Sequence, residues 1–128
     1  MYNGDISVLL VDDDMIRDCV GAYLEDEGFS VHGAESGEEA LESIARICPS
    51  VCISDMRLPG MDGAEFIIKA HTLCPETGYL LHTGMLYSLS DELRLIGMTA
   101  DDVLLKPIHD LSKLIDKIRQ LTAAGRKV

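Results

Sequence analysis

The sequence has few aromatic residues, few basic residues and no long apolar run. It contains no Trp, 4 Tyr and 2 Phe, so it offers no aromatic platform on which nucleic-acid bases could stack. Its 11 Lys+Arg are outnumbered by 22 Asp+Glu, and the formal net charge is −11. This imbalance argues against direct nucleic-acid binding by this domain and against a membrane partner, because both depend on neutralising anionic surfaces. The apolar runs are also too short to cross a bilayer.

Secretory and metal-binding features are missing as well. No basic segment precedes an apolar stretch at the N-terminus, as a secretory signal would require, and no CxxC pair or His/Cys metal-ligand spacing occurs. The cysteines lie among aliphatic residues, which predicts reduced, largely buried thiols in a cytoplasmic protein. The histidines, at positions 32, 71, 82 and 109, are interpreted as solvated or incidental.

The 128 residues are enough for one domain that folds without disulfides or metals, since 47% of them are hydrophobic. We expect a single domain over 1–128, with a core at about 6–122 and a tail or the start of a linker at 123–128. No internal linker or low-complexity segment divides the chain.

Short aliphatic runs alternate with helical patterns five times along the chain. We predict strands at about 6–11, 29–33, 50–54, 77–82 and 102–105, and helices at about 14–27, 36–48, 62–73, 88–97 and 110–123. Asp14 is expected to cap the first helix, and Ser36 with Glu39 and Asp62 with Glu65 resemble capping boxes. Such alternation predicts an α/β fold, in which a parallel sheet carries helices on both faces.

Polar residues follow four of the predicted strands. They are Asp12 and Asp13 after the first strand, Asp55 after the third, Thr83 after the fourth and Lys106 after the fifth. Ligands bind at the carboxyl ends of the strands in an open α/β sheet, so these side chains are expected to share one site. Each residue alone could be a cap or a turn residue, but the five together indicate a functional site.

Three carboxylates in one site need a counter-charge. Two unit charges about 4 Å apart repel by about 4 kcal/mol at an effective dielectric of about 20. A cation relieves this repulsion, and ligation by oxygen alone favours Mg²⁺. With Lys106 and Thr83 added, the group suits a phosphoryl group, and a carboxylate can act as the nucleophile that forms an aspartyl-phosphate.

These motifs resemble the receiver domain of two-component response regulators, a family similar to the chemotaxis regulator CheY. The resemblance rests on VLLVDD at 8–13, the loop SDMRLPGMDG at 54–63, HTG at 82–84 and TADDVLLKP at 99–107, and it covers almost the whole chain. It implies a three-layer αβα sandwich of the flavodoxin-like (βα)5 type, with five parallel strands in the order 2-1-3-4-5.

The resemblance implies a phosphoacceptor and a metal site. Asp55 would take a phosphoryl group from a kinase phosphohistidine or from a small donor such as acetyl phosphate. Asp13, Asp55 and the backbone carbonyl of Arg57 would ligate Mg²⁺, with Asp12 acting through water. Hydrolysis of the aspartyl-phosphate would reset the protein, so the only reactions expected are its own phosphorylation and dephosphorylation.

The resemblance also implies a switch, with one departure. Lys106 would pair with the phosphoryl oxygens, and Thr83 would turn inward and remodel the face formed by the fourth helix, fifth strand and fifth helix. The family usually has an aromatic residue three positions before the lysine, where this chain has Val103, which predicts a shorter mechanical link or a different output face. Arg57 and Met85 are expected to border the mouth of the site and to tune phosphoryl lifetime.

The expected partners are a sensor histidine kinase or phosphotransfer protein and a downstream effector domain or protein. A homodimer through the fourth helix, fifth strand and fifth helix stays open. Two alternatives are a degenerate receiver that binds proteins without phosphorylation, and a phosphatase of the haloacid-dehalogenase type with Asp12 as nucleophile. The second leaves the loop from Asp55 to Gly63 without a role.

Overall fold

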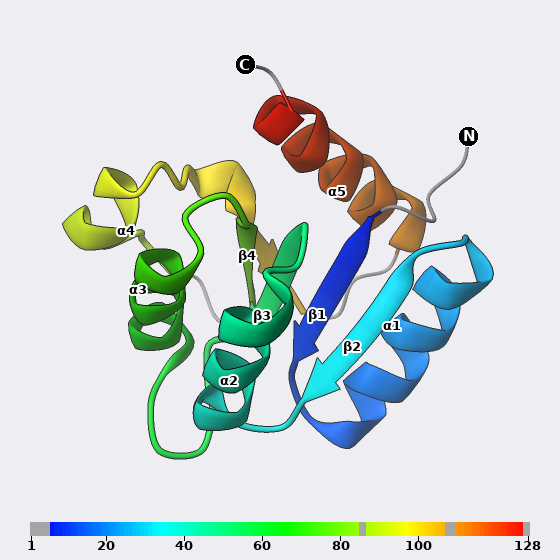
Figure 1. The fold of residues 1–128 in the computed structure, drawn as a ribbon, viewed down its shortest axis with the longest axis horizontal. Helices are drawn as coiled ribbons and strands as arrows, with labels where there is room; N and C mark the ends of the chain where they lie inside the picture. The colour runs from blue at the N-terminus through cyan, green and yellow to red at the C-terminus, as the bar shows by residue number, and fades with distance from the viewer. Residues whose placement is uncertain (1–5, 85–86, 107–109, 127–128) are drawn as a thin grey trace.

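The computed structural model describes residues 6–84, 87–106 and 110–126. One parallel sheet contains five strands in the order β2-β1-β3-β4-β5 (Figure 1). The strands are β1 (Ser7–Val11), β2 (Ser30–Ala34), β3 (Val51–Asp55), β4 (Gly78–Thr83) and β5 (Val103–Leu105). The helices are α1 (Asp14–Asp26), α2 (Gly37–Ile47), α3 (Gly63–Leu73), α4 (Asp91–Leu95) and α5 (Leu111–Arg126), with a short 3₁₀ turn, η1 (Ala100–Asp102). The predicted fold class and strand order are confirmed.

The strands are buried on both faces, and successive residues serve different helical layers. In β1, Val8 and Leu10 belong to the cluster formed with α1 and α5, whereas Leu9 and Val11 belong to the cluster formed with α2, α3 and α4. This two-residue alternation is the geometry of a strand, so the aliphatic runs form the middle layer of a sandwich.

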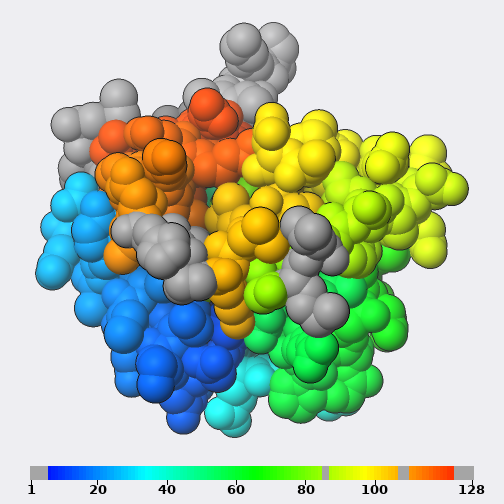
Figure 2. Space-filling model, turned by 180° about the vertical axis from the view of Figure 1, so that it is seen from behind, coloured from blue at the N-terminus to red at the C-terminus, as the bar shows by residue number. Residues whose placement is uncertain are grey.

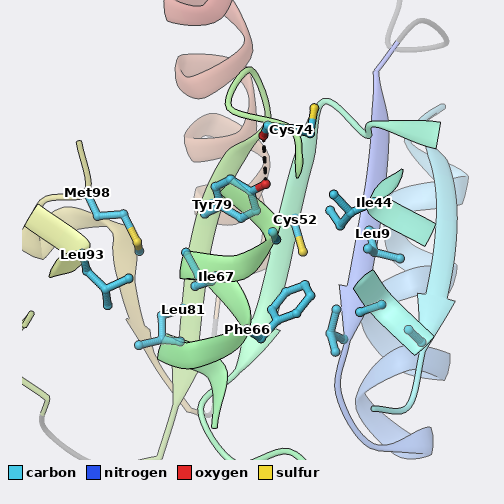
Figure 3. Close-up of a cluster of buried hydrophobic side chains, with 14 of the residues drawn as sticks. Leu9, Ile44, Cys52, Phe66, Ile67, Cys74, Tyr79, Leu81, Leu93 and Met98 are labelled. Carbon is cyan, nitrogen blue, oxygen red and sulfur yellow. Dashed lines mark hydrogen bonds between the residues drawn. The ribbon is translucent and has the colours of Figure 1, made fainter. Parts of the chain in front are cut away.

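Large side chains fill the layer between the sheet and helices α2 and α3. Figure 3 shows Phe66 and Ile67 of α3 lying against Cys52 and Leu81 of the sheet. All four are buried, and Cys52 is fully inaccessible. Dense packing of this kind fixes the sheet, so the ends of its strands are held in place.

Side-chain caps define the helix starts. Ser36 Oγ accepts a hydrogen bond from the Glu39 amide (3.1 Å), and Asp62 Oδ1 accepts one from the Glu65 amide (2.8 Å), as the sequence predicts. The prediction for α1 is wrong by one residue, because Asp13 is the cap, while Asp14 begins the helix and pairs with Arg17. An acidic residue is favourable at the first helical position as well as at the cap. The residue types alone therefore did not show whether Asp13 or Asp14 is the cap.

Two helices differ in length from their predictions. α4 has five residues, because Ser90 caps it by accepting a hydrogen bond from the Leu93 amide (3.2 Å) and Gly97 adopts a positive φ of 102° just after it. α5 extends to Arg126, three residues beyond the predicted end. Helix ends depend on these local caps, and the apolar periodicity does not reveal them.

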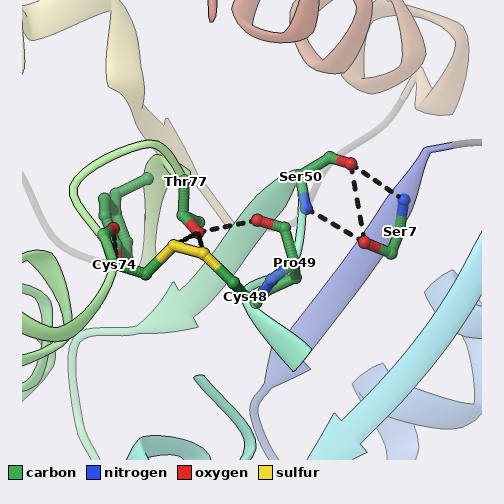
Figure 4. The surroundings of a disulfide bond; sticks show 7 residues. Ser7, Cys48, Pro49, Ser50, Cys74 and Thr77 are labelled. Atoms are coloured by element: carbon green, nitrogen blue, oxygen red, sulfur yellow. Dashed lines mark hydrogen bonds between the residues drawn. A yellow bond between two sulfur atoms is a disulfide. The ribbon is translucent and has the colours of Figure 1, made fainter. Parts of the chain in front are cut away.

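The cysteines contradict the prediction of reduced, largely buried thiols. Cys48 and Cys74 are joined by a disulfide with a Cα–Cα distance of 5.9 Å (Figure 4). Cys19 is exposed, and Cys52 alone of the four is a buried thiol. The prediction was wrong because the two partners lie 26 residues apart in sequence, and only the packing of α2 against α3 brings them together.

None of the helices in the described part of the chain is both long enough and apolar enough to traverse a lipid bilayer.

Candidate functional site

Strand register gathers four polar side chains at the carboxyl edge of the sheet, the lower edge in Figure 1. Leu10, Ile53, Leu80 and Leu104 all pack on the α1 and α5 side. The residues two positions further along each strand share that side, because side chains alternate along a strand. They are Asp12, Asp55, His82 and Lys106.

Asp12 is the most heavily contacted of these residues. It is 4% exposed and follows β1 directly. Its Oδ1 accepts hydrogen bonds from the Asp13 amide (2.8 Å) and from Lys106 Nζ (3.2 Å), and its Oδ2 lies 3.3 Å from His82 Nδ1. A buried carboxylate is costly unless it is paired, and these three donors satisfy it.

Asp55 and Lys106 form the open part of the site. Lys106 Nζ lies 3.3 Å from Asp55 Oδ1 and 3.2 Å from Asp12 Oδ1, so one ammonium group bridges the two carboxylates. Asp55 Oδ1 also accepts a hydrogen bond of 3.4 Å from the Arg57 amide. Asp55 is partly exposed, which leaves its carboxylate accessible to a reacting group.

Asp13 is exposed at the same edge and has a structural role as well. Its Oδ1 accepts a hydrogen bond from the Ile16 amide (2.9 Å) as the cap of α1. A carboxylate has about four lone-pair sites, so this bond leaves acceptor capacity for a cation. The helix cap therefore also orients Asp13 beside Asp12.

Thr83, the predicted switch residue, and Arg57 line a common cavity. Thr83 ends β4 and is buried, and the cavity next to it has a volume of about 430 Å³. Arg57 and Tyr87 also line it, together with Met56, Leu58, Met61 and Asp62. Arg57 lines this cavity beside Thr83, its predicted place at the mouth of the phosphoacceptor site stays a prediction, and Met85 lies outside the described residues.

Val103 occupies the position where the family usually has an aromatic residue. It begins β5, pairs in register with Leu81 and packs against the cluster under α3 and α4. Its aliphatic side chain is half-buried and serves the core. Its predicted effect on switching stays a prediction.

The interpretation of His82 as solvated or incidental is wrong. The side chain is buried, and its Nδ1 faces the Asp12 carboxylate. Because an ionised carboxylate only accepts, Nδ1 carries the proton, and Nε2 is buried without a hydrogen-bond partner among the described residues. The pairing of β3 with β4 could have identified this residue, because His82 lies opposite Asp55 and is therefore level with the acidic site.

The charges in the site stabilise one another. Burial alone would raise the pKa of Asp12, but the hydrogen bond from His82, the Asp13 amide and the Lys106 ammonium outweigh it and lower that pKa. Burial alone would lower the pKa of Lys106, but the charges and hydrogen bonds of Asp12 and Asp55 outweigh it and raise that pKa. At neutral pH the carboxylate is therefore ionised and the ammonium protonated.

The donor set fits a hard divalent cation. The carboxylates of Asp12, Asp13 and Asp55 lie at the same edge and offer oxygen ligands, although their oxygens do not all lie within 4.8 Å of one another in the described part of the chain. Oxygen ligands favour Mg²⁺ or Ca²⁺ over softer metals, and the net negative charge of three carboxylates against one ammonium calls for a cation.

Fold and site together define a doubly wound α/β protein with an acidic, lysine-bearing site at the carboxyl edge of its sheet. Residues 8–119 match the family described as the response regulator receiver domain. The chain belongs to this family. Receiver domains are signalling modules rather than general enzymes, they generally use Mg²⁺, and response regulators interact with histidine kinases and effector domains.

Two response regulators illustrate the sequence similarity. The chain is 34% identical over 115 residues to response regulator MprA of Mycobacterium leprae, covering 89% of this chain and 50% of MprA. It is 30% identical over 120 residues to the cell cycle response regulator CtrA of Brucella abortus, covering 93% of this chain and 51% of CtrA. The chain thus spans about half the length of these curated relatives.

Solved receiver structures match nearly from end to end. A CheY-like receiver domain protein of Methanospirillum hungatei has a TM-score of 0.82 and 31% identity, covering 95% of this chain and 97% of that protein. The response regulator TrrA of Thermotoga maritima, in complex with Mg²⁺ and BeF, has a TM-score of 0.77 and 27% identity, covering 91% of this chain and 98% of that protein.

Proposed function

We propose that this chain is a phosphoacceptor domain in which Asp55 receives a phosphoryl group from a histidine kinase or phosphotransfer protein. One observation carries the assignment: Lys106 Nζ lies within 3.3 Å of both Asp12 and Asp55 at the carboxyl edge of the sheet. Of the three site carboxylates, Asp12 is held by three donors, Asp13 caps α1, and Asp55 is the partly exposed one that faces the ammonium group.

Asp13, Asp55 and the carbonyl of Arg57 would hold Mg²⁺ directly, and Asp12 would act through water. When bound, Mg²⁺ supplies positive charge that neutralises the phosphoryl oxygens. The chain's own residues do the positioning: Asp13 is oriented by its cap, and Asp12 by His82 and Lys106. Lys106 pairs with a phosphoryl oxygen.

The transfer is a balanced displacement at phosphorus. A carboxylate oxygen of Asp55 attacks, an O–P bond forms, the N–P bond of the phosphohistidine breaks, and neutral imidazole leaves after protonation. In the reset, water attacks phosphorus, the O–P bond to Asp55 breaks and inorganic phosphate leaves. The enzymatic activity proposed is therefore limited to the domain's own phosphorylation and dephosphorylation.

The output surface is the face made by α4, β5 and α5, which lie together in Figure 2. Thr83 would hydrogen-bond the phosphoryl group and move the loop after β4, and β5 is tied to this point because the Lys106 amide donates to the Thr83 carbonyl (2.8 Å). Leu95 of α4 is 85% exposed and Leu105 of β5 is 49% exposed. These two exposed leucines would each be available to contact an effector domain or protein, or a second copy in a homodimer.

We also propose the setting of the domain. It acts in the cytoplasm, where its kinase and effector partners would meet it, and residues 1–128 form a single receiver with its core at about 6–122. It contacts neither nucleic acid nor membrane directly, because its net charge of −11 opposes both. The acidic surface leaves binding to proteins as its route of output.

Mg²⁺ with beryllofluoride, which mimics the phosphoryl group, tests the assignment. Backbone NMR spectra of the native protein are expected to shift around Asp55 and across residues 87–121, and Asp55→Asn is expected to abolish the shifts. Asp14→Asn is the matched control, since it removes an exposed carboxylate that is not proposed to touch the metal or the phosphoryl group. Shifts across 87–121 are expected to be smaller than in receivers with an aromatic at the Val103 position; equally large shifts contradict weakened coupling.

Two outcomes would overturn the proposal. No response of the native protein to beryllofluoride would make it a binding module that works without phosphorylation. Trapping of a phosphoryl group on Asp12 with acetyl phosphate would support the phosphatase reading. The structure argues against Asp12 as a nucleophile, because both of its carboxylate oxygens already accept hydrogen bonds and the side chain is buried.

A further inference from the structure

The Cys48–Cys74 disulfide lies at the edge of the sheet opposite the acidic site. Cys48 ends α2 just before β3, and Cys74 ends α3 just before β4, so both lie at the amino ends of strands (Figure 4). Asp55 lies at the other end of β3. The disulfide is therefore separate from the phosphoacceptor and needs its own explanation.

The backbone at Cys48 is specialised to present this sulfur. Cys48 has a φ of 42°, in the left-handed region, where Gly or Asn normally ends a helix. Its amide donates to the Ile44 carbonyl (2.9 Å), and the Cys74 amide donates to the Ala70 carbonyl (2.8 Å), so both helix ends are fixed by hydrogen bonds. The 5.9 Å Cα–Cα separation lies within the range that a disulfide spans.

The surroundings suit the dithiol as well as the disulfide. Thr77 Oγ1 lies 3.2 Å from Cys74 Sγ and 3.9 Å from Cys48 Sγ, and it donates to the Pro49 carbonyl at 2.6 Å. With its proton committed to Pro49, the hydroxyl oxygen can accept from a thiol S–H when the pair is reduced. The hydroxyl therefore offers the reduced pair a hydrogen-bond acceptor, while its own proton stays on the Pro49 carbonyl.

The two sulfurs differ in exposure, which gives them different roles. Cys48 is exposed, whereas Cys74 is 2% exposed and packs in the cluster between the sheet and α3 (Figure 3). A small disulfide in solution can reach Cys48 but not Cys74. Exchange is therefore expected to begin at Cys48, with Cys74 closing the bond.

We propose that Cys48 and Cys74 form a reversible thiol-disulfide site that couples the domain to the thiol redox state of its surroundings. The Cys48 thiolate attacks glutathione disulfide, forming a mixed disulfide and releasing one glutathione thiolate. The Cys74 thiolate then attacks Cys48 Sγ, releasing the second glutathione. Two cysteine thiols are oxidised and one glutathione disulfide is reduced to two glutathione thiols, which take up the two protons that the cysteines lose. In the cytoplasm, where we place the protein, such bonds are usually transient or redox-sensing.

Closing the bond links the end of α2 to the end of α3. The link constrains the unfolded chain, so the oxidised protein is expected to unfold at a temperature roughly 10 °C higher than the reduced protein.

Equilibration of the native protein with defined ratios of reduced and oxidised glutathione tests the site. Peptide mapping is expected to find Cys48 linked to Cys74 at oxidising ratios, and dithiothreitol is expected to reverse the link. Cys48→Asn, which suits the left-handed backbone, is expected to remove the rise in unfolding temperature. Cys19→Ser is the matched control, because Cys19 is exposed but unpaired and the rise should persist.

Stable glutathionylation of Cys48 without closure, or no linked peptide at any ratio, would overturn this inference. Neither result would affect the beryllofluoride response, so failure here is distinguishable from failure of the proposed phosphoacceptor function. The peptide map needs no variant and therefore does not depend on whether a substituted protein folds.

Discussion

At the scale of single residues, Asp12 organises the site although it is not the proposed phosphoacceptor. Its two oxygens collect a backbone amide, an ammonium and an imidazole, contributed by three separate stretches of chain. A group that hydrogen-bonds to a carboxylate at a metal site orients that carboxylate and commonly tunes the metal affinity. His82 makes this contact to Asp12.

His82→Leu is expected to weaken Mg²⁺ binding by about tenfold, because Asp12 loses the donor that fixes its Oδ2. Mg²⁺ titration followed by NMR measures the affinity. His82→Asn places an amide N–H where Nδ1 lies and is expected to restore most of it. A role in packing alone would predict the reverse order, with Leu the better replacement, and unchanged affinity in His82→Leu would contradict the assignment.

At the scale of elements, the loop between β3 and α3 depends on a close approach at Gly63. The Gly63 amide donates to the Met56 carbonyl at 2.6 Å. A Cβ at this position would lie 2.9 Å from Met56 Cα and 2.9 Å from Leu81 Cδ1, and closer still to the Asp55 carbonyl. The start of α3 can therefore pack against the end of β3 only without a side chain there.

Gly63→Ala is expected to destabilise the protein by about 2 kcal/mol, because backbone atoms must move to admit the methyl group. Urea unfolding measures this change. Gly84→Ala is the control, since a Cβ there meets nothing within 4 Å. Equal stability of the two variants would show that the loop can relax at no cost.

At the scale of the whole molecule, the acidic site and the disulfide lie at opposite edges of the sheet. The carboxyl edge holds the carboxylates and Lys106, and the amino edge holds the disulfide, with a tightly packed layer between them. Tyr79 connects that layer to the disulfide edge, because its hydroxyl donates to the Cys74 carbonyl at 3.0 Å (Figure 3). Burial raises the pKa of Tyr79 above its ordinary value of 10.0.

Stability is therefore expected to fall above about pH 10. The pKa of Tyr79 is higher in the folded state than in the unfolded state. The stability that protonated Tyr79 contributes is therefore complete below the unfolded-state pKa, and it is lost as pH rises toward the folded-state pKa. Tyr79→Phe is expected to be about 1 kcal/mol less stable at pH 8, where it lacks the hydrogen bond, and to lose less stability on going to pH 10.5. Urea unfolding at both pH values, with the disulfide kept in one redox state, makes the comparison. An equal alkaline loss in both proteins would contradict this role of Tyr79.

Local patterns were sufficient to predict most of the fold. The aliphatic strands and the alternation of strand and helix follow from side-chain periodicity, which each segment carries by itself. Helix ends were less accurate: Asp13 rather than Asp14 caps α1, and Ser90 shortens α4. These ends depend on which of several neighbouring caps the backbone adopts.

The sequence alone determined the parallel α/β sheet and the convergence of Asp12, Asp55 and Lys106, because parallel strands present their carboxyl ends at one edge whatever the details of packing. The tertiary structure decided what lies beside them. His82 reaches Asp12 from a strand 70 residues away, and Cys48 reaches Cys74 across 26 residues. Such contacts depend on strand register and on the packing of one helix against another, and no local pattern encodes either.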